Sequence, residues 1–147
     1  MGRRASRELA MKLLYQLEVQ KEDRQEQIET ALNEEEGLTD SDRKYVEDVV
    51  EGVYRNIAYL DETIEKYSKG WKINRMPKVD LNILRLAIYE ISFREDIPFN
   101  VSVNEAVELA KKYSTKEAGS FINGILGKVP HVRVSRQEEI KAEVNKT

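Results

Sequence analysis

The chain has 147 residues, of which 40% are hydrophobic and 35% are charged, and its net charge at pH 7 is −3. This composition suits one compact domain, or two small bundles that share a core, and it excludes a polycation that coats nucleic acid with its whole surface. Because the chain has no cysteine, disulfides and thiolate metal sites are excluded, and because no signal peptide is recognisable we expect a cytoplasmic protein.

The secondary structure is expected to be helical throughout. Glycine and proline are few, at 7 and 3 residues, and no segment alternates between apolar and polar residues as a half-buried strand does. The first predicted helix spans residues 4–19, where Leu9, Leu13 and Leu17 recur every four residues and form a buried stripe. A short acidic helix is predicted at 24–33.

The next segment begins at a run of helix-capping residues. Residues 39–42 read Thr-Asp-Ser-Asp, and side chains of these types accept hydrogen bonds from the first free N–H groups of a helix. A long helical segment is therefore predicted from there, with a bend between 56 and 61 and an end near Gly70. Residues 71–76 then form a connection.

Residues 79–93 are predicted to form the central helix of the fold. Ten of these fifteen residues are apolar, and at about 100° per residue they occupy most of the helix circumference. Pro77 stands just before the pattern, where a missing N–H costs nothing, and Pro98 lies beyond its end. The helix is too short and too charged to cross a membrane, so we expect the other helices to pack around it.

Two further helices are predicted from capping boxes, in which Ser or Thr is followed three residues later by Glu. One box is Ser102-Val-Asn-Glu105, and the other is Ser114-Thr-Lys-Glu117. After Pro130 the chain is polar and mixed in charge, so 131–147 is expected to be a flexible polar tail.

The strongest functional signal is a basic edge on the first helix. On a helical wheel Arg3, Arg4 and Arg7 fall within roughly 60° of one another, with Tyr15 close by and Lys12 somewhat farther round. The planar guanidinium donates two hydrogen bonds to a phosphate at once, and a tyrosine can stack on an unpaired base. The edge therefore indicates an RNA surface, although ordinary solvated arginines would give the same spacing.

Other sites are poorly supported by the sequence. Residues 1–6 fit the N-myristoylation pattern, which leaves a lipid-anchored protein open as a further hypothesis. Residues 119–124 resemble half a phosphate loop but lack its Lys-Ser/Thr ending. His131 has no second ligand at metal spacing. Because no catalytic motif is present, we expect no enzyme, no catalytic residue, no metal and no cofactor.

Several motifs occur together along the chain. They include Arg-Arg-x-x-Arg-x-x-Ala from residue 3 and Leu-Arg-x-Ala-x-Tyr-Glu from residue 84. The segments concerned are residues 3–15, 58–61, 84–90, 97–98, 104–111 and 121–126. In this order they resemble the NusB family of bacterial transcription antitermination factors, and the resemblance covers about residues 3–129.

The resemblance implies a fold and a function. The fold is all-α, with two small helical bundles packed together and about seven helices, in a single domain over residues 1–130. The bundles are expected at about 1–57 and 58–130. The implied function is binding of the boxA sequence of ribosomal RNA operon transcripts together with ribosomal protein S10. With other Nus factors, this complex keeps RNA polymerase resistant to termination, and no reaction is catalysed.

The resemblance also implies which residues carry the function. Residues expected to bind RNA are Arg3, Arg4, Arg7, Lys12, Tyr15, Glu117 and Phe121. Residues expected to face S10 are Asp80, Arg85 and Tyr89. The alternative function is a protein-interaction module that self-associates through its arginine-bearing face, so a homodimer is possible.

Overall fold

The computed structural model describes residues 3–131, and within them the regular structure is entirely helical. Seven α-helices and one short 3-10 helix (η1) follow one another along this part of the chain. Their bounds are α1 Arg3–Val19, α2 Arg24–Glu34, α3 Asp40–Arg55, α4 Ile57–Tyr67, η1 Ile73–Arg75, α5 Lys78–Phe93, α6 Phe99–Tyr113 and α7 Lys116–Leu126. The all-α class predicted from the sequence is confirmed.

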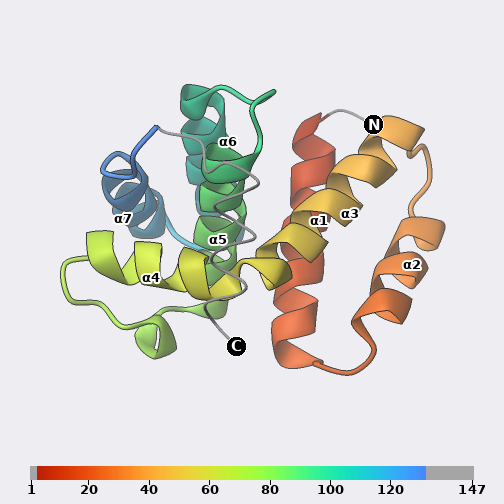
Figure 1. Ribbon diagram of the computed structural model, residues 1–147, viewed down its shortest axis with the longest axis horizontal. Coiled ribbons are helices and arrows are strands. Elements are labelled where there is room, and N and C mark those ends of the chain that lie inside the picture. Colours follow the sequence, from red (N-terminus) through yellow and green to blue (C-terminus); the bar gives the residue numbers. More distant parts are fainter. Residues whose placement is uncertain (1–2, 132–147) are drawn as a thin grey trace.

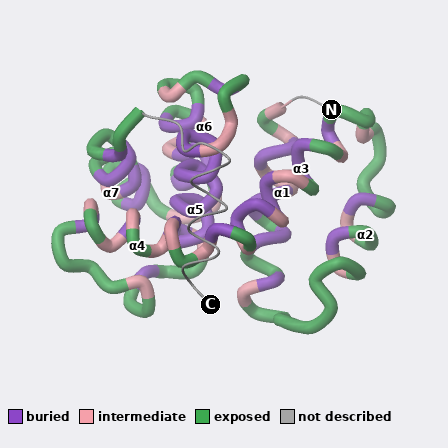
Figure 2. Tube along the Cα trace, viewed as in Figure 1, coloured by how far each residue is buried: buried purple, intermediate pink, exposed green. Residues whose placement is uncertain are grey.

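Helix α5 is the centre of the core. Every residue from Asp80 to Ser92 is buried, as expected for a helix that is apolar on most of its circumference. It packs against α1, α3, α4, α6 and α7, and Figure 2 shows it as a buried segment in the middle of the molecule. The helices that carry the candidate site residues are therefore positioned through α5.

The remaining helices form groups around α5 (Figure 1). Helix α1 packs against both α2 and α3, whereas α7 packs against α4 and α6. The chain passes from the first group to the second at Asn56, a single residue between α3 and α4. A division into bundles near residue 57 stays a prediction, and residues 132–147 of the expected tail lie outside the described part of the chain.

Helix α3 begins at the predicted capping residues. The backbone N–H of Asp42 donates to Oγ1 of Thr39 at 3.1 Å, and the backbone N–H of Thr39 donates to Oδ2 of Asp42 at 3.0 Å. This reciprocal pair satisfies two backbone donors and fixes where the helix starts. Ser6 of α1 also donates to Oδ1 of Asp42 at 3.0 Å, which ties the starts of α1 and α3 together.

The two predicted capping boxes, at 102–105 and 114–117, are wrong. Helix α6 begins at Phe99, directly after Pro98, so Ser102 lies inside the helix, where its buried hydroxyl donates to Glu90 at 2.8 Å. A proline fits the start of a helix, and here it sets the boundary a turn earlier than the serine would.

Helix α7 is capped one residue later than predicted. Oγ1 of Thr115 accepts the backbone N–H of Ala118 at 2.9 Å, so Thr115 is the N-cap. The backbone N–H of Ser114 instead donates to the carbonyl of Ala110 at 2.8 Å, which makes Ser114 the C-cap that follows the last residue of α6, Tyr113. Within residues 3–131, no helix has the length and apolar composition needed to cross a membrane.

Candidate nucleic-acid interface

Arg4 is the most accessible arginine of the predicted edge. Its side chain is 66% exposed, and its Nε and Nη2 donate to the two carboxylate oxygens of Glu105 on α6 at 3.0 and 3.1 Å. These hydrogen bonds and the charge of Glu105 raise the pKa of Arg4, so the guanidinium stays charged. Because an exposed pair of this kind contributes little stability, a phosphate could replace the Glu105 carboxylate.

Arg3 is half-buried at the start of α1. Its guanidinium carbon lies 4.4 Å from the centre of the Tyr45 ring, in cation–π geometry. Its Nη1 is buried and has no hydrogen-bond partner among the described residues. The ring of Tyr45 thus holds the guanidinium of Arg3 close to Arg4 at the start of α1.

Arg7 is buried, with only 4% of the residue exposed. Its Nε and Nη2 donate to the two carboxylate oxygens of Glu90 on α5 at 2.9 and 3.1 Å. Burial by itself would lower the pKa of Arg7, but the hydrogen bonds and charge of Glu90 offset burial and raise it. The guanidinium is therefore held inside the protein, and its burial is evidence against a direct contact with RNA.

Glu90 joins four helices at one buried carboxylate. Besides Arg7 of α1, it accepts hydrogen bonds from the hydroxyls of Tyr45 on α3 and Ser102 on α6. Burial, together with the Glu90 charge, raises the pKa of Tyr45 strongly, so its phenol remains a donor. The carboxylate thereby fixes the start of α1, where Arg3 and Arg4 lie, relative to α3 and α6.

Lys12 and Tyr15 continue the exposed side of α1. The ammonium of Lys12 lies 5.3 Å from the centre of the Tyr113 ring, and Tyr15 is 41% exposed. Glu8 joins this side of α1 to α6, because it accepts hydrogen bonds from Lys112 at 2.8 Å and from Tyr113 at 2.9 Å. A cation and an accessible aromatic ring are thus available for phosphate and base contacts.

Glu117 and Phe121 lie on α7, away from the start of α1 (Figure 1). Glu117 is exposed in the first turn of α7. Phe121 is half-buried, and its ring meets that of Trp71 edge to face with the centroids 5.8 Å apart. The structure thus brings together Arg3, Arg4 and Arg7 at the start of α1, whereas Glu117 and Phe121 lie on a different helix.

The three residues expected to face S10 are buried in α5. Arg85 forms two hydrogen bonds with Asp61, at 2.8 and 2.9 Å, and one with Glu18 at 3.0 Å. Tyr89 donates to Asp48 at 3.0 Å. Oδ1 of Asp80 is buried without a hydrogen-bond partner among the described residues.

Sequence reasoning missed the partners of the arginines. Glu90, Tyr45 and Glu105 were not predicted as site residues, although a glutamate inside a largely apolar helix indicates a buried cation nearby. Among the described residues there is no group of three or more acidic or histidine side chains that could hold a metal ion.

Comparison with known sequences finds a matching family model and relatives that all carry the same name. A model described as the NusB family matches residues 4–131. A transcription antitermination protein NusB from Acetivibrio thermocellus is 64% identical over 134 residues, which cover 91% of this chain and 92% of the relative. A protein with the same name from Ruminiclostridium cellulolyticum is 65% identical over 129 residues, or 88% of each chain.

Solved structures match the fold over most of the chain. T. maritima NusB has a TM-score of 0.83 at 34% identity, and the match covers 96% of this chain and 98% of that one. The complex of the antitermination factors NusB and NusE with double-stranded RNA includes a chain with a TM-score of 0.77 at 29% identity. That match covers 85% of this chain and 92% of the other.

Proposed function

This chain belongs to the NusB family, and on that basis we propose that it is a transcription antitermination protein that binds RNA jointly with NusE, which is ribosomal protein S10. The observation that carries the proposal is the likeness over nearly the whole chain to proteins of that name. The RNA is the boxA element of ribosomal RNA transcripts. The protein acts in the cytoplasm with other Nus factors and RNA polymerase, and it catalyses no reaction.

The geometry of α1 supports a small RNA contact surface. Arg4 is exposed and forms an ion pair with Glu105, while Arg3 lies against Tyr45 beside it. Lys12 and Tyr15 extend this surface along the helix. Arg7 has a different part in the proposal: through Glu90 it fixes the end of α1 that presents Arg3 and Arg4.

A surface with so few cations gives weak binding that depends on salt, because each phosphate contact contributes separately. A second protein on the same RNA raises the effective concentration and offsets this weakness. We therefore expect S10 to be needed for tight binding. Direct S10 contacts by Asp80, Arg85 and Tyr89 stay predictions, as does self-association, and the burial of these residues favours an indirect part in shaping α5.

The proposal predicts that the variant carrying both Arg3→Gln and Arg4→Gln binds boxA RNA about tenfold more weakly in the presence of S10, because charge-assisted contacts to phosphate are lost. Gel shift or fluorescence anisotropy with labelled RNA measures the affinity. The matched control is Lys21→Gln, which removes an exposed cation from the α1–α2 loop and should leave the affinity unchanged. Equal affinities of the wild-type protein and the double variant would contradict the proposed surface.

A further inference from the structure

Carboxylates of the protein itself pair with the exposed cations beside the α1 surface. Nε and Nη2 of Arg4 donate to the two carboxylate oxygens of Glu105, and Nζ of Lys112 donates to Glu8 at 2.8 Å. Both pairs join α1 to α6, so they lie along the side of α1 on which RNA is proposed to bind. The cations of this surface are therefore partly neutralised before any RNA arrives.

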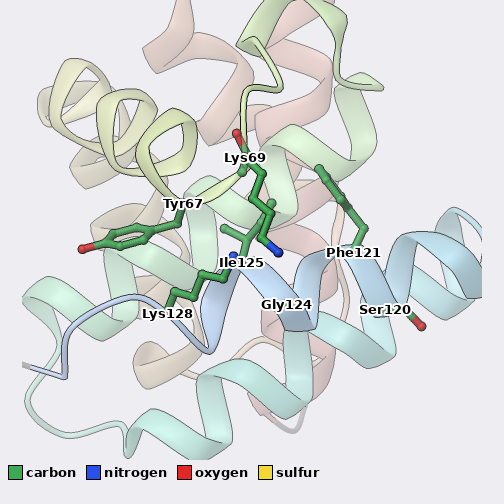
Figure 3. A pocket seen from close by; sticks show the side chains of 8 residues that line it. Tyr67, Lys69, Ser120, Phe121, Gly124, Ile125 and Lys128 are labelled. Atoms are coloured by element: carbon green, nitrogen blue, oxygen red, sulfur yellow. The ribbon is translucent and has the colours of Figure 1, made fainter.

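Such pairing is not a general property of the molecular surface. The pocket between the end of α4 and α7 is lined by two exposed lysines, Lys69 and Lys128, and by no acidic residue (Figure 3). Within residues 3–131 neither of these lysines forms an ion pair. The chain thus leaves cations unpaired beside α7, whereas it places a carboxylate on the most accessible arginine of α1.

The Arg4–Glu105 pair has the geometry that a phosphate would adopt. Two parallel hydrogen bonds from one edge of a guanidinium suit a carboxylate and a phosphate equally well. The same two donors of Arg4 cannot serve both anions at once. The side chain of Glu105 is only 17% exposed, against 66% for Arg4, so the carboxylate is held against the protein and is already in place.

Further negative charge surrounds the same arginine. The hydrogen bonds and charge of Glu105 are the main cause of the raised pKa of Arg4, and the charges of Glu108 and Glu8 raise it further. These two residues lie one helical turn after Glu105 and Arg4 respectively. A phosphate that approaches Arg4 therefore meets three carboxylates of the protein, of which only Glu105 occupies the hydrogen-bonding edge.

We propose that Glu105 is an intramolecular competitor of RNA, because it occupies the phosphate-binding edge of Arg4 and must be displaced when the transcript binds. The inference rests on the proposed RNA-binding function and concerns how that surface is regulated. Displacement lowers the affinity of α1 for any single phosphate. Contacts elsewhere on the same RNA, made by S10, then offset the cost through effective concentration.

Replacing Glu105 with glutamine is expected to increase affinity. In the presence of S10, Glu105→Gln should bind boxA RNA about fivefold more tightly than the wild-type protein, because no charged acceptor then holds the two donors of Arg4. Fluorescence anisotropy with labelled RNA measures the affinity. A variant that binds no more tightly than the wild-type protein would overturn the proposal.

A neighbouring glutamate provides the matched control. Glu108→Gln removes the same charge one turn farther along α6, and within residues 3–131 no hydrogen bond joins Glu108 to Arg4. It should change the affinity by less than about twofold, because an exposed charge without a direct contact is screened by salt. If both variants raised the affinity equally, the cause would be net charge, and the competition would be excluded.

A double-mutant cycle shows whether Glu105 acts through Arg4. In the Arg4→Gln background, the further change Glu105→Gln should raise the affinity by less than about twofold, because no guanidinium remains to be released. If the whole gain persisted in that background, Glu105 would act independently of Arg4, and the proposal would be wrong.

The outcomes separate this inference from the proposed function. If wild-type protein with S10 binds the RNA but Glu105→Gln does not bind it more tightly, the competition fails and the α1 surface stands. If wild-type protein with S10 does not bind the RNA, the proposed function fails as well.

Discussion

Replacing Glu90 with glutamine is expected to reduce the free energy of unfolding by about 3–5 kcal/mol, because it leaves the buried guanidinium of Arg7 without a counter-charge. The same substitution weakens the acceptor for the hydroxyls of Tyr45 and Ser102. Four helices meet at this carboxylate, so the loss affects the whole fold. Urea denaturation followed by circular dichroism measures the change.

The matched control removes the partner of the exposed arginine instead. Glu105→Gln breaks the Arg4 pair, which is largely solvated, and it should leave the denaturation midpoint almost unchanged. If Glu90→Gln unfolds at the same urea concentration as the wild-type protein, the carboxylate does not have the structural part assigned to it.

Replacing Gly52 with alanine is expected to destabilise the protein by about 1–3 kcal/mol, although alanine is the better helix former. Gly52 lies on α3 where the ring of Tyr89 crosses it, and a Cβ there would overlap the ring. Tyr89 has little freedom to move, because it stacks on Phe93 and donates to Asp48. Urea denaturation again measures the free energy of unfolding.

A second glycine gives the opposite expectation. Gly124→Ala makes the same change inside α7, where the new Cβ meets nothing, so it should stabilise the protein by up to about 1 kcal/mol. Combining Gly52→Ala with Tyr89→Leu, which removes the obstructing ring, should restore part of the lost stability. If Gly52→Ala were as stable as the wild-type protein, α3 and α5 could move apart at this contact at little cost, and the prediction would be wrong.

The sequence was most informative where the pattern was long. The apolar pattern over 79–93 predicted the central helix, and α5 spans Lys78–Phe93. The residues 39–42 predicted the start of α3 because a capping box is a local arrangement, complete within four residues. In both cases neighbouring residues contain the physical cause of the structure.

A local pattern predicted the wrong helix start where a residue distant in the sequence determines the structure. Ser102 fits a capping box, yet its hydroxyl donates to Glu90, and α6 starts earlier, at Phe99 directly after Pro98. A capping motif of four residues occurs often, so a competing start signal or a tertiary hydrogen bond can override it.

The basic edge of α1 could likewise be predicted only in part from the local sequence. A helical wheel places Arg3, Arg4 and Arg7 together but does not say which of them faces the core. Arg7 shares the buried face of α1 with Ala10 and Leu14, and its partner lies 83 positions away along the chain. Only a charged residue in the apolar α5 pattern hinted at this pair.

The central claim is that RNA contacts the N-terminal end of α1 through the guanidinium groups of Arg3 and Arg4, whose position Glu90 and Arg7 fix. It is tested most directly by the salt dependence of boxA RNA affinity in the presence of S10, for wild-type protein and for Arg4→Gln. The account predicts that the slope of log affinity against log salt becomes less steep by about 0.7 when Arg4 is lost. A slope unchanged by the substitution would contradict it.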